Sequence, residues 1–181
     1  MENVLQKLGI IEPHTLQQVR ASIDTDAQQE TGFIALLKEH HSFLEESIMV
    51  IMDPKATIPD KRAHINRFFN LLEMHGKAEQ ETLYVHLQQN TEEEARLEGL
   101  CGQDEHDVAF QLRDELQAMG YKTQWNDEIA AKAKVLASLV KNHIKEEEDI
   151  MFPIAKKDLS DEEMEQMRVE YIAKCRTYLL H

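Results

Sequence analysis

Hydrophobic residues recur at alternating steps of three and four along most of the chain, which is the period of an amphipathic α-helix. The pattern becomes regular after Thr31 and first breaks at Asp53-Pro54, where the residue before a proline disfavours the helical conformation. We therefore predict a helix over residues 31–52. Its apolar stripe consists of Ile34, Leu37, His41, Leu44, Ile48 and Ile51.

Start and stop signals divide the rest of the chain into four more helices. Ser or Thr followed three residues later by Glu forms a capping box, Asn can also cap a helix start, and Gly ends a helix. Short links between four long helices force neighbouring helices to run antiparallel, which predicts an up-down-up-down four-helix bundle with a short C-terminal fifth helix. The predicted signals are Pro59-Asp60, Thr91 with Glu94, Gly120, Asn126, and Ser160 with Glu163.

The second and fourth predicted helices have long apolar stripes of their own. The second runs from residue 59 to about 90, and the fourth from residue 126 through at least 154. The two stripes contain Phe68, Leu71, Leu72, Leu83 and Leu87, and Ile129, Val135, Leu136, Leu139, Val140, Ile150 and Ile154.

The composition agrees with an all-α protein in one domain. Gly (6) and Pro (4) are scarce among 181 residues, whereas good helix formers are plentiful and residues that favour strands are few. No flexible linker divides the chain. We expect residues 31–181 to form the bundle and residues 1–30 to be an N-terminal extension packed on it.

The net charge of −14 restricts the possible partners. Contacts with nucleic acid or with anionic lipid need clustered Lys and Arg, so we expect neither partner. The two cysteines, Cys101 and Cys175, are far apart and predict no thiolate site. Without a recognisable signal peptide or an apolar run of about 18 residues, a cytoplasmic location is expected, and the oligomeric state stays open.

A repeated His-x-x-x-Glu motif is the strongest chemical signal. It occurs at His75 and Glu79 and again at His143 and Glu147. Four residues are just over one helical turn, so each pair projects from one face. Both motifs are followed at the same offsets by a large apolar residue and an aromatic one, Leu83-Tyr84 and Met151-Phe152. Burying a Glu beside a His inside a bundle is costly unless a metal compensates the charge.

The other two long helices each offer an inward histidine. On the third helix it is His106. On the first helix His41 continues the apolar stripe better than the alternative, His40, because Leu44 and Ile48 follow it at helical spacing. The predicted ligands are thus His41 (or His40), His75, Glu79, His106, His143 and Glu147. Tyr84 is expected to pack over the site, with a hydrogen bond to a bound oxidant as the alternative.

This order of residues, His, HxxxE, His and HxxxE on four helices, resembles the hemerythrin-like (HHE cation-binding) family over about residues 31–157. The resemblance implies a non-haem di-iron centre, two irons with an oxo or hydroxo bridge. In that centre Glu79 and Glu147 bridge the metals, and His41, His75, His106 and His143 each bind one iron.

Two departures separate the chain from oxygen-carrying hemerythrins. Phe110 stands where those proteins have a second histidine on the third helix, and Glu147 follows His143 by four residues where they have an aspartate at five. The ligand set is more similar to di-iron proteins of iron–sulfur cluster repair and nitric oxide stress, and to stand-alone bacterial hemerythrin-like proteins.

Three hypotheses for function follow. The first is a protein that binds or senses O2, NO or peroxide, in iron handling or in the response to oxidative or nitrosative stress. The second is a di-iron oxidoreductase that consumes peroxide or NO. The third is a structural helical bundle with an incidental metal such as zinc, since His and Glu accept several metals.

Overall fold

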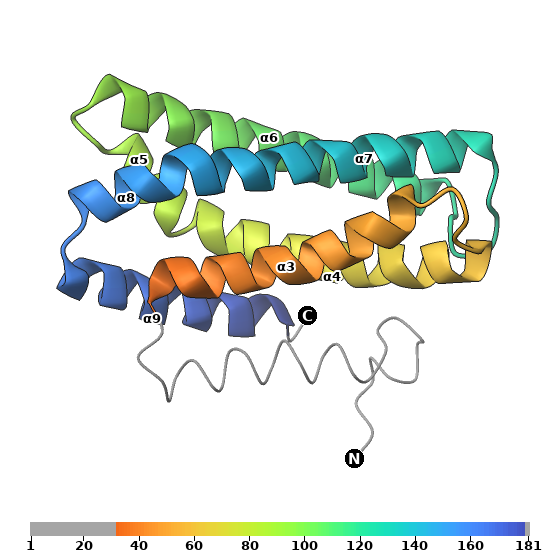
Figure 1. Cartoon of the computed structure of the whole chain (residues 1–181), viewed down its shortest axis with the longest axis horizontal. Helices are drawn as coiled ribbons and strands as arrows, with labels where there is room; N and C mark the ends of the chain where they lie inside the picture. The colour runs from red at the N-terminus through yellow and green to blue at the C-terminus, as the bar shows by residue number, and fades with distance from the viewer. Residues whose placement is uncertain (1–31, 180–181) are drawn as a thin grey trace, which may run out of the picture.

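The computed structural model describes residues 32–179, and every regular element in that range is a helix. The four long helices are α3 (Phe33–Met52), α4 (Ile58–Gln80), α6 (Glu93–Ala118) and α7 (Asp127–Glu146), and they lie alongside one another (Figure 1). Helix α3 packs on α4 and α7, and α6 packs on α7 and α4. The predicted all-α four-helix bundle is confirmed. The predicted N-terminal extension, residues 1–30, lies outside the described residues.

Most of the predicted helix ends are found in the structure. Helix α3 stops before Asp53-Pro54, and Gly120, with a φ of 71°, lies in the turn just after α6. The Asn126 side chain accepts a hydrogen bond from the backbone N–H of Ile129 at 2.9 Å. Such side chains satisfy backbone groups that a helix end leaves without partners.

The predicted capping box of Thr91 and Glu94 is wrong. Helix α6 begins at Glu93, and its N-cap residue, Glu92, makes no side-chain capping bond. Instead, the Asn90 side chain accepts the backbone N–H of Glu92 at 2.9 Å. Asn competes well for this role because its short side chain reaches nearby backbone N–H groups.

The second helix is interrupted just after the Glu of its HxxxE motif and the fourth at that Glu, which the apolar stripes did not predict. Helix α4 ends at Gln80, and a short helix, α5 (Leu83–Gln88), follows Thr82, whose backbone is not helical (φ −129°, ψ −85°). Helix α7 leads into a π-helical turn, η1 (Glu147–Met151), and then α8 (Phe152–Asp158). In η1 the N–H of Phe152 donates to the carbonyl of Glu147, five residues earlier.

The π turn changes which residues of the fourth helix face the core. It inserts an extra residue into the helical repeat, so Met151 is fully buried while Ile150, predicted for the core, is 37% exposed. Val135, also predicted for the core, is exposed because the inner face there consists of Ala133, Leu136, Ala137 and Val140.

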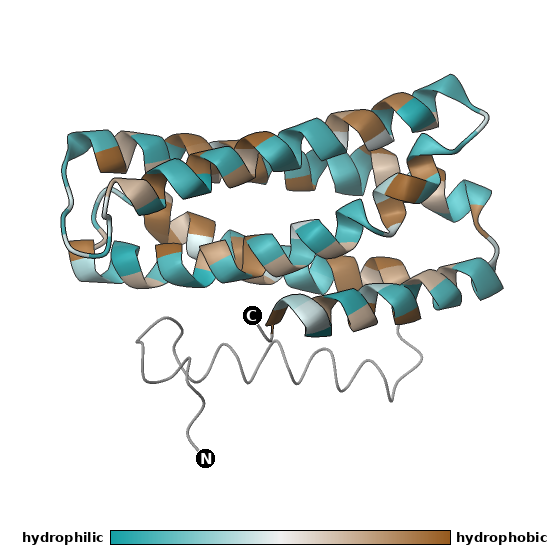
Figure 2. Ribbon diagram, turned by 180° about the vertical axis from the view of Figure 1, so that it is seen from behind, coloured by the Kyte–Doolittle hydropathy of each residue, from teal (hydrophilic) through white to brown (hydrophobic). Residues whose placement is uncertain are grey.

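The fifth helix, α9 (Asp161–Leu179), starts with the predicted Ser160–Glu163 capping box and packs on α4 and α3. It buries Tyr171, Ile172 and Cys175 against them. Teal, the colour of hydrophilic residues, covers much of the ribbon in Figure 2. Of the helices in residues 32–179, none is long and apolar enough to cross a membrane.

Candidate metal centre

The six predicted ligands come from α3, α4, α6, α7 and η1 and converge inside the bundle. None of them is more than 4% exposed. Their potential ligand atoms form two groups in which all atoms lie within 4.8 Å of one another. The first group is His41, His75, Glu79 and Glu147, and the second is His106, His143 and Glu147.

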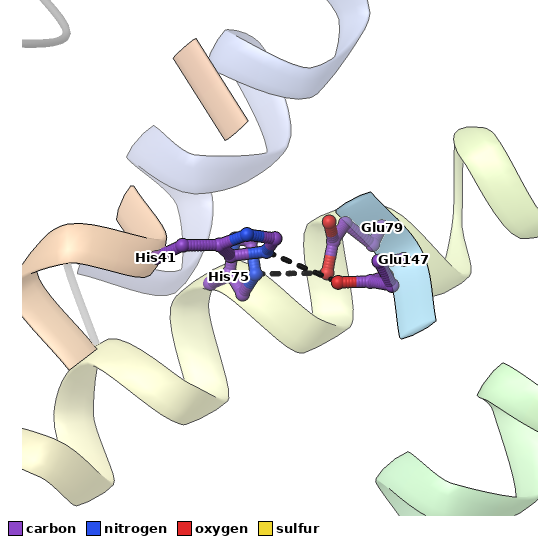
Figure 3. A group of neighbouring side chains, drawn as sticks. All are labelled: His41, His75, Glu79 and Glu147. Carbon is purple, nitrogen blue, oxygen red and sulfur yellow. Dashed lines mark ion pairs between the residues drawn. The ribbon is translucent and has the colours of Figure 1, made fainter. Parts of the chain in front are cut away.

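In the first group two imidazole nitrogens face two carboxylates. His41 Nε2 lies 3.0 Å from Oε2 of Glu147, and His75 Nε2 lies 3.0 Å from Oε2 of Glu79. Figure 3 shows both rings directed at the paired carboxylates, which come from α4 and from η1. The π turn begins at Glu147, so it shapes the segment that carries this carboxylate.

The second group is arranged around the hydroxyl of Tyr84. This Oη lies 3.3 Å from Nε2 of His106 and 3.0 Å from Nε2 of His143, and it donates to Oε1 of Glu147 at 2.5 Å. His143 Nε2 is itself 3.5 Å from the same oxygen. Glu79 lies between the groups, because its Oε2 is also 3.8 Å from Nε2 of His106.

A second layer of residues holds the outward nitrogen of three of these histidines. Glu148 lies 2.9 Å from Nδ1 of His41, and Glu105 lies 2.6 Å from Nδ1 of His143. Tyr171 Oη lies 2.7 Å from Nδ1 of His75. Such partners fix the ring orientation and leave Nε2 for a metal. The sequence pattern predicts no such role for these three residues, since Glu148 and Glu105 look like solvated neighbours of a ligand and Tyr171 lies 96 residues from His75.

The polar atoms that converge in the bundle have an incomplete set of hydrogen bonds. Nε2 of His41 and of His75, both oxygens of Glu79 and Oε2 of Glu147 are buried without a hydrogen-bond partner, since the short N···O contacts among them lack hydrogen-bond geometry. Burying polar atoms without hydrogen bonds is expensive. A cation among them would compensate the cost, and nitrogen with carboxylate oxygen is a donor set for divalent metals. The residues therefore fit a metal.

The comparison with known protein families agrees with this geometry. The family model described as Hemerythrin HHE cation binding domain matches residues 32–155. The chain belongs to this family. No curated protein and no solved structure was found to match it. The family match and the buried His and Glu cluster together support a hemerythrin-like domain compatible with metal binding.

Burial and charge set the protonation states in this HHE domain. Burial holds the pKa of His75 well below its usual value and lowers that of His106 to about 3. Burial would also lower the pKa of His143, but the nearby carboxylates of Glu147 and Glu105 outweigh it and raise the pKa to about 10. A metal that binds through His143 must therefore displace a proton.

The pKa values of the two glutamates of the HxxxE motifs are also shifted in opposite directions. Burial and then the charge of Glu147 raise the pKa of Glu79 well above its usual value. For Glu147 the effect of burial is outweighed by His143 and His41, which hold its pKa well below the usual value. One negative charge in the metal-free site is thus concentrated on Glu147, the residue that belongs to both groups.

His40, the alternative to His41, joins neither group. Its side chain is 1% exposed, and its Nδ1 lies 2.8 Å from the Tyr171 hydroxyl. Its pKa falls to about 3 because of burial and then the nearby His41. The placement of His41 with Glu147 favours His41 as the ligand, in agreement with its position in the apolar stripe.

Proposed function

We propose that this protein is a non-haem di-iron protein that binds or senses O2, NO or peroxide, in iron handling or in the response to oxidative or nitrosative stress. One iron would be held by His41 and His75, the other by His106 and His143, with Glu79 and Glu147 shared between them. Bound in this way, iron supplies ligand binding and one-electron redox chemistry that no side chain provides.

The observation that carries the proposal is the position of Glu147 between the two groups. Its Oε2 faces His41 at 3.0 Å, and its Oε1 faces His143 at 3.5 Å. A carboxylate whose two oxygens face different nitrogen donors suits a pair of metals better than a single one. Oxygen Oε2 has no hydrogen-bond partner, which leaves it available to a cation.

The donor chemistry supports iron and restricts the ligand to small molecules. Both groups offer imidazole and carboxylate, and neither includes a cysteine. Aromatic rings cover the histidines: Phe152 stacks on His41 with centroids 5.6 Å apart, and Tyr84 lies 5.1 Å from His106. Because all six ligand side chains are buried, diatomic molecules, peroxide or azide fit this site better than larger substrates.

The Tyr84 hydroxyl favours a second candidate function, an oxidoreductase that consumes peroxide or NO. It is an O–H group within 3.3 Å of three potential metal-ligand atoms of the second group. A buried hydroxyl in that position can deliver a proton to a reduced ligand. In an oxidoreductase this proton would be transferred to the ligand, whereas in a binding protein it would stay on Tyr84. The two functions are therefore separable by experiment.

The test is to load the full chain with Fe(II) without oxygen and to measure iron by plasma mass spectrometry. We expect about two irons per chain, near-ultraviolet charge-transfer bands in air, and spectral changes with azide or NO. His41→Ala should lose iron, whereas His40→Ala, the matched control on the neighbouring residue, should keep two irons with lower affinity. Catalytic loss of peroxide or NO would favour the oxidoreductase. A chain that folds equally well and holds no stoichiometric iron would be a structural bundle.

A further inference from the structure

Tyr171 connects the C-terminal helix to the metal centre. It lies on α9, outside the residues that match the HHE family, and its side chain is fully buried. Its hydroxyl lies 2.7 Å from Nδ1 of His75 and 2.8 Å from Nδ1 of His40. One hydroxyl thus joins α9 to a predicted ligand on α4 and to a second buried histidine on α3.

The direction of these hydrogen bonds follows from the proposed metal centre. If Nε2 of His75 binds a metal, the ring proton is on Nδ1, which donates to the Tyr171 oxygen. The hydroxyl proton of Tyr171 is then free to be donated to Nδ1 of His40. His40 in turn carries its proton on Nε2, a buried atom with no hydrogen-bond partner among the described residues. With a metal bound, the direction of each of these hydrogen bonds is thus defined.

The environment of Tyr171 leaves its hydroxyl little freedom. Phe33 packs edge-on against its ring with centroids 5.6 Å apart, and the His40 ring lies at the same distance. Cys175, one turn further along α9, is buried and also interacts with the hydroxyl. A tyrosine hydroxyl can both donate and accept a hydrogen bond, so His75 and His40 can use it in both roles at once.

We propose that Tyr171 is a positioning residue for the metal centre, which orients His75 through its Nδ1 and makes helix α9 a part of the site, with His40 as the terminal acceptor of the chain of hydrogen bonds. This inference rests on the proposed di-iron function. It also makes the docking of α9 and the binding of metal reciprocal, since each orders the hydrogen bonds that the other uses.

The test compares iron affinity in two variants that each remove one hydroxyl from α9. Tyr171→Phe deletes the bonds to both histidines. Tyr178→Phe, the matched control, deletes a surface contact with Glu81. Competition with a chelator for Fe(II), using the full chain, should show an affinity loss of about 10- to 100-fold for Tyr171→Phe. Tyr178→Phe should bind iron as the wild-type chain does.

A second pair of variants separates positioning from a merely structural role. His40→Asn keeps an oxygen near the place of Nδ1 as acceptor, and His40→Leu keeps only the apolar volume. We expect His40→Asn to retain near-wild-type iron affinity and His40→Leu to lose part of it. The rise in Tm on iron loading should be smaller in Tyr171→Phe than in the wild-type chain, whatever the Tm of the metal-free proteins.

The outcomes distinguish this inference from the proposed function. A wild-type chain that binds two irons, with Tyr171→Phe binding them equally tightly, would overturn the inference and leave the di-iron function standing. A wild-type chain that binds no iron would overturn the di-iron function, and the role of Tyr171 with it. Equal affinity losses in Tyr171→Phe and Tyr178→Phe would show a general effect of α9 packing and would also overturn the inference.

Discussion

The hydroxyl of Tyr84 lies 2.5 Å from Oε1 of Glu147 and donates a hydrogen bond to it. Tyr84 follows Glu79 by five residues, and Phe152 follows Glu147 by the same interval. Both rings cover a histidine of the site, Phe152 over His41 and Tyr84 next to His106. Each half of the centre thus has an aromatic ring beside a histidine, and the halves differ by one hydroxyl, which contacts His106, His143 and the shared Glu147.

Tyr84→Phe should destabilise the metal-free protein by about 1–3 kcal/mol, because the buried carboxylate of Glu147 loses its O–H donor. The cost should be smaller after iron loading, when a cation balances the charge of Glu147. Urea unfolding with and without iron measures both quantities. Tyr121→Phe is the control, since its hydroxyl bonds to Asn66 away from the site. Equal stability of wild-type and Tyr84→Phe chains without iron would contradict the prediction.

Gly102 on α6 leaves the space that the Tyr84 ring occupies. A Cβ at this position would lie 2.9 Å from Cζ of Tyr84 and 3.1 Å from Cε of Met151. Gly102→Ala should therefore displace the ring and destabilise the protein by about 1–3 kcal/mol, although alanine favours a helix by about 1 kcal/mol. Chemical denaturation checks the stability, and iron affinity should fall as well.

Gly99→Ala is the comparison for this variant. The three atoms nearest to a Cβ there belong to Leu87 and Gln88 on α5, and none of them to Tyr84. It should destabilise the contact between α5 and α6 without the loss of affinity expected of Gly102→Ala. An iron affinity that falls equally in both variants would assign the effect to helix packing and not to the tyrosine.

The sequence was sufficient to predict the bundle and the residues that meet inside it. The apolar stripes around His75 and His143 place both histidines on buried faces, and the spacing of four stacks each with its glutamate. These features are local to one helix, so periodicity detects them. The same reasoning preferred His41 to His40, and the structure places His41 against Glu147.

The features that the sequence did not reveal depend on contacts between distant segments. The helix is interrupted at Thr82 and at the π turn from Glu147 to Met151. The apolar residues on either side of each interruption still recur at helical spacing, so the stripes in the sequence look continuous. Tyr171 lies 96 residues from His75 in the chain. The role of Glu105 has no sequence signal either, because a charged residue next to a ligand can lie in solvent or can hold a histidine ring, as Glu105 holds His143.

The capping box at the start of α9 predicts a specific pH dependence. Glu163 accepts hydrogen bonds from the backbone N–H and the hydroxyl of Ser160, which lower its pKa. The folded state thus favours the carboxylate, so its contribution to stability is complete above the usual pKa of 4.5 and is lost as the pH falls through the lower folded value. Glu163→Gln should have a lower Tm than the wild-type chain at pH 7 and a smaller difference from it at a second pH well below 4.5.

Glu162→Gln is the matched control for this pH effect. It removes the same charge from the same helical turn, and Glu162 makes no hydrogen bond to Ser160. The comparison matters because any lost negative charge also relieves repulsion in a chain of net charge −14. A difference in Tm between wild-type and Glu163→Gln chains that is the same at both pH values would exclude the capping box as its cause.

The sharing of Glu147 by two groups predicts how iron is lost from variants of the site. His106 belongs only to the second group, so His106→Ala should reduce the iron content from about two per chain toward one. Glu147 belongs to both groups, so Glu147→Gln should reduce it below one. Plasma mass spectrometry after Fe(II) loading and desalting measures the content directly.

Glu148→Gln controls for the loss of a carboxylate next to Glu147. Glu148 contacts the outward Nδ1 of His41, and a glutamine oxygen can still accept that hydrogen bond. This variant should keep two irons, bound more weakly. If Glu147→Gln retained one iron, the carboxylate would serve a single metal. If His106→Ala retained both irons, the second group would not be a metal site. A stepwise loss, with one iron gone in His106→Ala and both in Glu147→Gln, would support a pair of metals joined by this residue.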